Sequence, residues 1–118
     1  MKYKLEGKTF QSIENMVNGE VSSDTFFHYH QSGELITADY SGGKIVQGHL
    51  LGKMLDNGDL TFSYHHLNTD GELMFGKCTS SLEVLPDGRL KYIEQWQWLT
   101  GDRSQGTSQI VEINSKDY

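Results

Sequence analysis

Two histidines placed two positions apart are the first residues of this sequence whose types and spacing could do chemistry. His28 and His30 lie in the stretch FFHYHQSGELI, residues 26–36, and Glu34 follows four positions after His30. Alternate residues of a β-strand point to the same face, and neutral imidazole nitrogens bind transition metals well. A strand here would therefore present a pair of metal ligands.

The residues that would complete such a metal site are missing. The pair and Glu34 resemble the first half of the cupin metal motif, in which two histidines and a glutamate bind a divalent ion. The second half needs a histidine after a Pro-Asp-Gly turn, but residues 86–88 are followed by Arg-Leu-Lys. Glu34 also falls in a predicted turn. We therefore expect no bound metal and interpret His28 and His30 as polar residues on an outer strand face.

Other chemical groups are sparse. Cys78 is the one cysteine, so we interpret it as a structural thiol, and there is neither a Gly-x-Ser-x-Gly elbow nor a glycine-rich phosphate loop. We expect no cofactor. His49 and Glu94 could act as an acid and base pair, but their spacing does not demand it. The catalytic residues are therefore left unassigned.

Five glycine-containing turns indicate the elements that must position these side chains. QSGEL (31–35), SGGKI (41–45), DNGDL (56–60), TDGEL (69–73) and PDGRL (86–90) each place a turn before an apolar residue. Between them lie runs rich in β-branched and aromatic residues, a pattern typical of β-hairpins. The predicted strands lie near residues 3–14, 24–31, 34–41, 44–55, 59–68, 72–85, 89–99 and 105–114.

Eight consecutive antiparallel strands predict a barrel. Closure removes the two exposed edges that an open sheet would leave. We therefore predict an all-β, up-and-down antiparallel meander that closes into a barrel, with residues 1–118 as a single domain. An eight-stranded barrel has room for one small ligand, whereas a sandwich would be filled by side chains.

The turns also predict which side chains face inward, if each is a two-residue hairpin. The inward face then holds Phe27, Tyr29, Ile36, Tyr40, Ile45, His49, Leu51, Phe62, Tyr64, His66, Phe75, Tyr92, Trp96 and Trp98. Lys53, Lys77, Glu83 and Glu94 are predicted to lie among these aromatic residues, and buried ionisable groups either pair or hold a ligand. The predicted ligand-binding residues are Tyr29, Tyr40, His49, Phe62, Tyr64, His66, Phe75, Tyr92, Glu94, Trp96 and Trp98.

The opposite face is predicted to be the outside of the barrel. It carries His28 and His30, together with Cys78 and the glycines at 48 and 76. It also carries the apolar residues Leu35, Val46, Leu50, Met54, Met74, Leu82, Val84 and Ile93. An exposed apolar surface of this kind predicts a homodimer or a covering segment.

The composition limits the partners and the location. Ten basic and sixteen acidic residues give a formal charge of -6, with the basic residues scattered, so we expect no nucleic acid partner. No segment has the run of about 18 to 20 apolar residues that crosses a bilayer, so we expect no membrane partner. The start MKYKLEGKTF lacks the apolar run of a secretory signal, which predicts a cytoplasmic protein.

Four blocks carry a resemblance that covers nearly the whole chain. GEVSSDTFFHYHQ, YSGGKIVQGHLLG, GELMFGKCTSSLEVLPDGR and EQWQWLTGD resemble a family of short bacterial proteins named N-acetylglutamate synthase. That resemblance implies an acetyltransferase, although the string closest to a coenzyme A motif, residues 103–108, departs at its last position. At the level of fold, the predicted barrel resembles the calycins, the lipocalin and fatty-acid-binding type barrels.

Three functions remain open at this point. The leading hypothesis is a barrel that binds a small apolar or aromatic molecule, with Tyr29, Tyr64, Trp96 and Trp98 as walls and His49, His66 or Glu94 as polar anchors. The first alternative is an enzyme, either the acetyltransferase or another acid-base catalyst. The second alternative is a homodimeric interaction module with a filled core.

Overall fold

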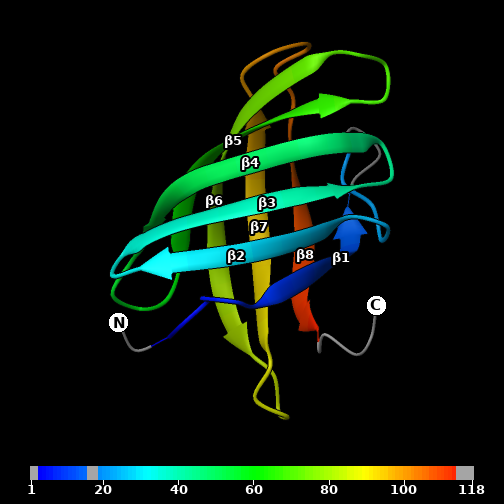
Figure 1. Ribbon diagram of the computed structural model, residues 1–118. Coiled ribbons are helices and arrows are strands. Elements are labelled where there is room, and N and C mark those ends of the chain that lie inside the picture. Colours follow the sequence, from blue (N-terminus) through cyan, green and yellow to red (C-terminus); the bar gives the residue numbers. More distant parts are fainter. Residues whose placement is uncertain (1–2, 16–18, 114–118) are drawn as a thin grey trace.

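The eight predicted strands are present and form one closed barrel in the computed structural model, which describes residues 3–15 and 19–113 (Figure 1). Each strand pairs antiparallel with the next, and β8 pairs with β1 to close the barrel. The strands are β1 (Thr9–Asn15), β2 (Phe26–Ser32), β3 (Leu35–Gly42), β4 (Ile45–Met54), β5 (Leu60–Asn68), β6 (Leu73–Val84), β7 (Leu90–Trp98) and β8 (Gln105–Ile113). The predicted up-and-down architecture is confirmed. The described residues include no helix that could span a membrane.

The N-terminal segment closes one end of the barrel instead of extending β1. The predicted strand at 3–14 is therefore too long at its start, because β1 begins at Thr9. The Gly7 amide donates to the Tyr29 carbonyl at 3.0 Å, and the Leu5 amide donates to the Gln31 side chain at 2.7 Å. Leu5 is fully buried. The segment therefore covers this end of the barrel, and Leu5 packs into the core there.

Aromatic side chains fill the interior near that closed end. The ring of Phe10 lies 5.2 Å from the ring of Tyr29 and 5.8 Å from that of Tyr92, between centroids. All three side chains are fully buried. Figure 1 shows β2, β3 and β4 crossing in front of β6, β7 and β8 at a steep angle, which is the strand tilt expected of a small barrel.

Three hairpin loops contain three residues instead of the predicted two. Between β4 and β5, the Leu55 amide donates to the Asp59 carbonyl at 2.8 Å, and the glycine that ends the loop, Gly58, has a φ of 94°. The same backbone pattern closes residues 68–72 and 85–89. A three-residue loop ending in a left-handed glycine is a common hairpin connection. Each added residue inverts the face of the following strand relative to the prediction.

A β-bulge causes one further inversion in β4. Gly42 pairs with Ile45, as a two-residue turn requires, but Tyr40 pairs with Gly48. One extra residue therefore lies in β4 between these two pairs, and the strand alternates in the opposite sense beyond it. The loop before β5 then restores the predicted faces, the loop before β6 inverts them, and the loop before β7 restores them again.

The prediction of facing is consequently right in β2, β3, β5 and β7 and wrong in most of β4 and in β6. His49, Leu51, Lys53, Phe75, Lys77 and Glu83 lie on the outside, contrary to the prediction. Leu50, Met54 and Cys78 lie inside, where the prediction had placed them outside. Tyr29, Tyr40, Phe62, His66, Tyr92, Glu94, Trp96 and Trp98 are buried as predicted, and Tyr64 is partly buried.

Candidate functional site

An aromatic-lined cavity lies inside the barrel at the end opposite the N-terminal segment. Its volume is about 40 Å³, and residues 19–21 of the β1–β2 connection form part of its lining. The aromatic walls come from four strands and comprise Phe27, Tyr40, Phe62, Tyr64, Trp96 and Trp98. These residues sit at alternate positions of their strands, so a period of two places all of them on the inner face.

The aromatic rings contact one another edge to face, at a tilt or stacked, so they line much of the cavity. The ring centroids of Trp96 and Trp98 are 5.8 Å apart, and those of Tyr64 and Trp98 are 5.6 Å apart. Across the barrel, Phe27 and Tyr40 stack at 5.0 Å. Such pairs stabilise each other beyond their apolar burial and hold the wall in one arrangement.

Two inward-facing glycines make room for two of these rings. A Cβ atom at Gly48 would collide with the ring of Tyr40, and one at Gly76 would collide with Tyr64. Both glycines lie on the inner face, although the prediction placed them outside. Glycine in a strand interior often marks such a close approach. The positions of the glycines therefore determine how the tyrosines line the cavity.

Glu94 places a carboxyl group inside this apolar cavity. It is 6% exposed and accepts a hydrogen bond from the Ser108 hydroxyl at 2.9 Å, and Ser80 is a second hydrogen-bond partner. The three residues are directly opposite one another on β6, β7 and β8. Burial raises the pKa of Glu94 to about 7, because its effect is larger than the opposite effect of the hydrogen bonds from the two serines. The carboxyl group is thus poised to gain or lose a proton near neutral pH.

Cys78 lies beside this group with its thiol facing the cavity. Its Sγ atom is 3.6 Å from the hydroxyl of Ser80, and the side chain is buried. Burial raises the pKa of Cys78 well above its ordinary value, and the nearby Glu94 adds to this. A protonated thiol is a poor nucleophile, so Cys78 contributes shape to the site.

A second polar cluster connects residues 19–21 to the barrel wall. His66 is 1% exposed, and its Nε2 lies 2.7 Å from Oε1 of Glu20, while its Nδ1 lies 2.9 Å from the Tyr40 hydroxyl. The amide of Asn68 donates to the other carboxylate oxygen of Glu20 at 2.9 Å. Because a carboxylate only accepts, the neutral imidazole donates from Nε2 and accepts at Nδ1. Burial lowers the pKa of His66 and favours this neutral form, although Glu20 opposes the shift.

Sequence reasoning missed Glu20 and Asn68 as parts of the site. Glu20 lies in a connection between strands, where no periodic pattern predicts a direction. Asn68 ends β5 and also organises the next loop, because its Oδ1 accepts from the amides of Asp70 and Glu72. An Asn two positions before an Asp-Gly pair is a loop signal, but it does not predict a contact with a residue 48 positions away.

Seven of the eleven predicted ligand-binding residues line the cavity, namely Tyr40, Phe62, Tyr64, His66, Glu94, Trp96 and Trp98. Tyr29 and Tyr92 are in the packed core and are not among the lining residues. His49 and Phe75 lie outside, where His49 is 3.0 Å from an Asp39 carboxylate oxygen and Phe75 stacks on His65 at 5.7 Å. Whether the seven bind a ligand stays a prediction.

The histidines of the opening strand lie on the outer face, as predicted. The Nδ1 of His28 is 3.1 Å from the Thr9 hydroxyl, and the Nδ1 of His30 is 3.3 Å from a Glu6 carboxylate oxygen. Within residues 3–15 and 19–113, no three His, Cys, Asp or Glu side chains are grouped so that they could hold a metal ion.

The comparisons with known proteins agree with this architecture. No curated protein sequence matches the chain. The acetyltransferase activity implied by the name N-acetylglutamate synthase finds no support in these comparisons. The profile of a family described as Avidin-like protein matches residues 3–113, nearly the whole chain, and an eight-stranded antiparallel barrel fits both that family and the calycin-like architecture. The chain therefore belongs to the family of Avidin-like proteins.

Proposed function

We propose that this protein binds a small organic molecule in the interior of its barrel, in the cavity that Gly19, Glu20 and Val21 help to line. The observation that carries the proposal is a concave, aromatic-lined interior that also contains a few convergent polar groups. Most small-molecule sites have this composition, because the apolar wall provides affinity and the polar groups fix the orientation of the ligand.

The buried carboxyl of Glu94 argues for a binding site and against a merely filled core. Its pKa is raised to about 7, so keeping it ionised in the barrel costs free energy that an apolar residue of similar volume would not cost. Strongly perturbed groups in cavities are enriched at functional sites. A ligand that hydrogen-bonds to this carboxyl would recover part of that cost.

The size of the cavity indicates how a ligand enters. A cavity volume of about 40 Å³ holds on the order of three water molecules, so a larger molecule displaces part of the lining. Gly19 to Val21 are the lining residues that lie outside the strands, and Glu20 holds them through its hydrogen bonds to His66 and Asn68. We infer that binding displaces Gly19, Glu20 and Val21 from their present positions in the lining.

Biotin is the first molecule to test, because the chain matches the Avidin-like family. It is a compact bicyclic urea with an apolar body, and this shape suits aromatic walls with a buried hydrogen-bond acceptor. The test panel also contains 2-phenylethanol, phenylacetate and 2-phenylethylamine, which share one aromatic body and differ in charge.

Tryptophan fluorescence tests the proposal directly. The chain has two tryptophans, and both Trp96 and Trp98 line the cavity, so the whole tryptophan signal reports on this site. We expect at least one member of the panel to change this signal with saturation and to remain bound in native mass spectrometry. A complete absence of both effects would show that the interior is only a core.

A matched pair of substitutions locates the binding. Leu50 is buried and lines the cavity, whereas its neighbour Leu51 is 51% exposed on the outer face. We expect Leu50→Phe to weaken binding at least tenfold by filling the cavity, and Leu51→Phe to leave it unchanged. Equal affinity in the two variants would place the ligand elsewhere and refute the interior site.

A further inference from the structure

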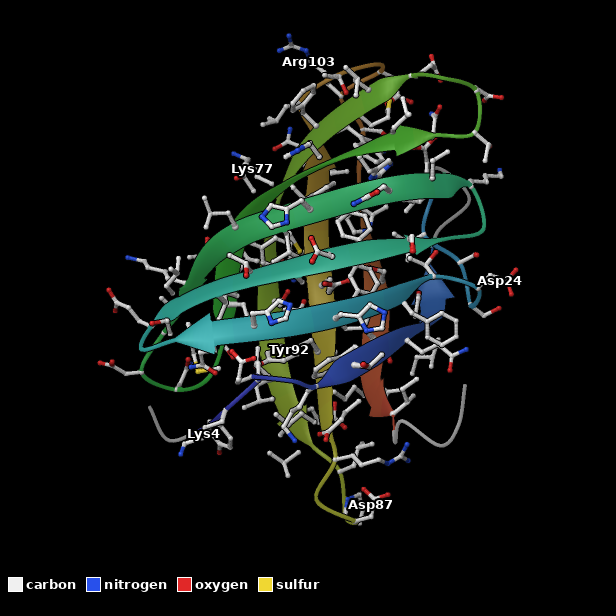
Figure 2. All side chains as sticks on the ribbon, in the orientation of Figure 1. Lys4, Asp24, Lys77, Asp87, Tyr92 and Arg103 are labelled. Atoms are coloured by element: carbon white, nitrogen blue, oxygen red, sulfur yellow. The ribbon has the colours of Figure 1, made fainter. Side chains whose placement is uncertain are left out.

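The ionisable side chains that line the cavity are acidic or, at neutral pH, uncharged. Glu94 lies in the interior, Glu20 belongs to the β1–β2 connection, and His66 is held in its neutral form. Among the described residues, no lysine or arginine lines the cavity. Figure 2 shows the basic side chains of Lys77 and Arg103 projecting away from the barrel. The interior is therefore a region of negative potential in a protein that already has a formal charge of -6.

Within the described part of the chain, Glu94 has hydroxyl partners and no positively charged one. Its described hydrogen-bond partners are Ser108 and Ser80, and no ion pair to it occurs within residues 3–15 and 19–113. Buried carboxylates are normally paired with a cation or coordinate a metal. The missing cation is the group that a ligand could supply.

The titratable groups that face Glu94 stay neutral around pH 7, so Glu94 is the group among them that changes its charge there. They face it from four different strands and are Tyr29 on β2, Tyr40 on β3, Tyr64 on β5 and Cys78 on β6. Burial raises the pKa of each of these four, so all are neutral at pH 7. His66 on β5 lines the same cavity and has a lowered pKa.

The aromatic walls also favour a positive charge. The faces of tryptophan and tyrosine rings carry negative potential and attract ammonium groups, more strongly where both are shielded from water. Trp96, Trp98 and Tyr64 line the same cavity as Glu94. Trp96 is two residues from Glu94 on β7, so its ring lies on the same inner face.

We propose that the ligand is a small organic cation, an amine or ammonium group on an apolar body, with Glu94 as its counter-ion. This inference rests on the proposed function, since it names the class of ligand for the same cavity. Binding draws the ammonium to the ionised carboxylate, so the protonated fraction of Glu94 releases its proton to solvent.

Three ligands with one aromatic body test the charge preference. We expect 2-phenylethylamine, as its ammonium ion, to bind at least tenfold more tightly than 2-phenylethanol, and phenylacetate to bind most weakly. Tryptophan fluorescence titration measures all three affinities. A preference for the alcohol or the acid over the ammonium would overturn the inference and leave the proposed function intact. If none of the three and no biotin binds, both proposals fail together.

The pH dependence of ammonium binding identifies the counter-ion. Since the pKa of Glu94 is about 7, its ionised fraction falls from about nine-tenths at pH 8 to about one-tenth at pH 6. We expect the affinity for 2-phenylethylamine to fall about tenfold between these pH values, and the affinity for 2-phenylethanol to change little. Protonation of His66 would act in the same direction, so a variant must separate the two groups.

The Glu94→Gln variant makes that separation, with Glu83→Gln as its control. Glu83 is exposed on the outer side of β6, so its substitution makes the same change in net charge away from the cavity. We expect Glu94→Gln to lose at least tenfold in ammonium affinity and to lose the pH dependence, while Glu83→Gln keeps both. Retention of both by Glu94→Gln would refute the role of Glu94.

Proton release provides a second measurement that needs no variant. At pH 7, a carboxyl with a pKa of about 7 is half protonated, so ammonium binding should release about half a proton per molecule bound. Calorimetry in buffers with different ionisation enthalpies measures this number. Binding without proton release at pH 7 would contradict the proposed counter-ion even if Glu94→Gln failed to fold.

Discussion

Replacing Glu94 by glutamine should stabilise this protein at alkaline pH, although the residue is buried. The carboxyl of Glu94 has a higher pKa in the folded chain than in the unfolded chain, because burial disfavours its charged form. The folded state therefore binds its proton more tightly. Between the two pKa values, the free energy of unfolding must fall as the pH rises.

The size of this effect follows from the shift. The pKa rises from 4.5 to about 7, and each unit corresponds to about 1.4 kcal/mol, so full ionisation of Glu94 costs about 3 kcal/mol of stability. About 2 kcal/mol of this cost develops between pH 5.5 and pH 8.5. Glutamine keeps the shape of the side chain and does not ionise. The difference in stability between Glu94→Gln and the natural protein should therefore grow by about 2 kcal/mol, in favour of the variant, over this range.

Urea denaturation followed by tryptophan fluorescence measures the difference at each pH. His66 contributes in the opposite sense, because a lowered pKa makes the unfolded state the better proton acceptor and stability rises with pH around and below 6.5. That contribution is present in both proteins and cancels in their difference. Parallel stability curves across the whole pH range would refute the reasoning, because they would mean that Glu94 titrates alike in the folded and unfolded chains.

Three further predictions concern residues 19–21, the core tyrosines and the outer surface. Glu20→Ala removes the hydrogen bonds that hold residues 19–21 to the barrel, so Cys78 should react with iodoacetamide at least fivefold faster, as measured by mass spectrometry at one pH. Tyr29→Phe removes a buried hydroxyl with no hydrogen-bond partner in the described part of the chain and should stabilise by up to about 1 kcal/mol, whereas Tyr92→Phe removes a bonded hydroxyl and should destabilise by about 1 kcal/mol in urea denaturation. If the predicted homodimer forms through the outer apolar surface, light scattering should give a dimer mass that Phe75→Lys, at a residue 44% exposed, reduces to that of a monomer.

Each of these predictions has a control or a contradicting result. Glu72→Ala removes another carboxylate that accepts from the Asn68 side chain, at 3.1 Å, but leaves the hydrogen bonds of Glu20 to His66 and Asn68 in place, so it should leave the labelling rate of Cys78 unchanged. Equal stabilities of Tyr29→Phe and Tyr92→Phe would contradict the assignment of hydrogen bonds in the core. A monomer mass for the natural protein would exclude self-association at the concentration measured.

The strands could be predicted from sequence because their signals are local. Glycine, often beside Asn or Asp, gives a turn its positive φ, and β-branched and aromatic runs favour extended backbone. Those signals place seven of the eight strands within a few residues of their observed bounds. The start of β1 was missed because a local turn precedes it: the Lys8 amide donates to the Leu5 carbonyl at 2.9 Å and Gly7 has a φ of 75°. The prediction read the Glu6-Gly7 pair as part of the strand.

The composition of the site was harder to predict, because one extra residue in a loop or strand moves every following side chain to the other face of the sheet. His49 and Phe75 were placed inside by assuming two-residue turns and no bulge, and one extra residue in β4 and one in the 68–72 loop move them outside. A two-residue and a three-residue loop share the same Asp-Gly signal, so local sequence does not separate them. Trp96 and Trp98 were placed correctly because the four inversions before β7, one bulge and three longer loops, cancel in pairs.

The sequence by itself determined that this protein is an antiparallel β-barrel whose aromatic residues gather inside, since turn chemistry and a period of two are properties of neighbouring residues. Only the tertiary structure decided that the carboxyl of Glu94 has hydroxyl partners and no cation among the described residues, and that Glu20 reaches His66 from 46 positions away. Burial and partnership depend on the closure of the barrel, which brings together strands that are distant in sequence. For that reason the barrel, its inner aromatic residues and the inward position of Glu94 could be predicted from the sequence, whereas the outward positions of Lys53 and Lys77 depended on the fold.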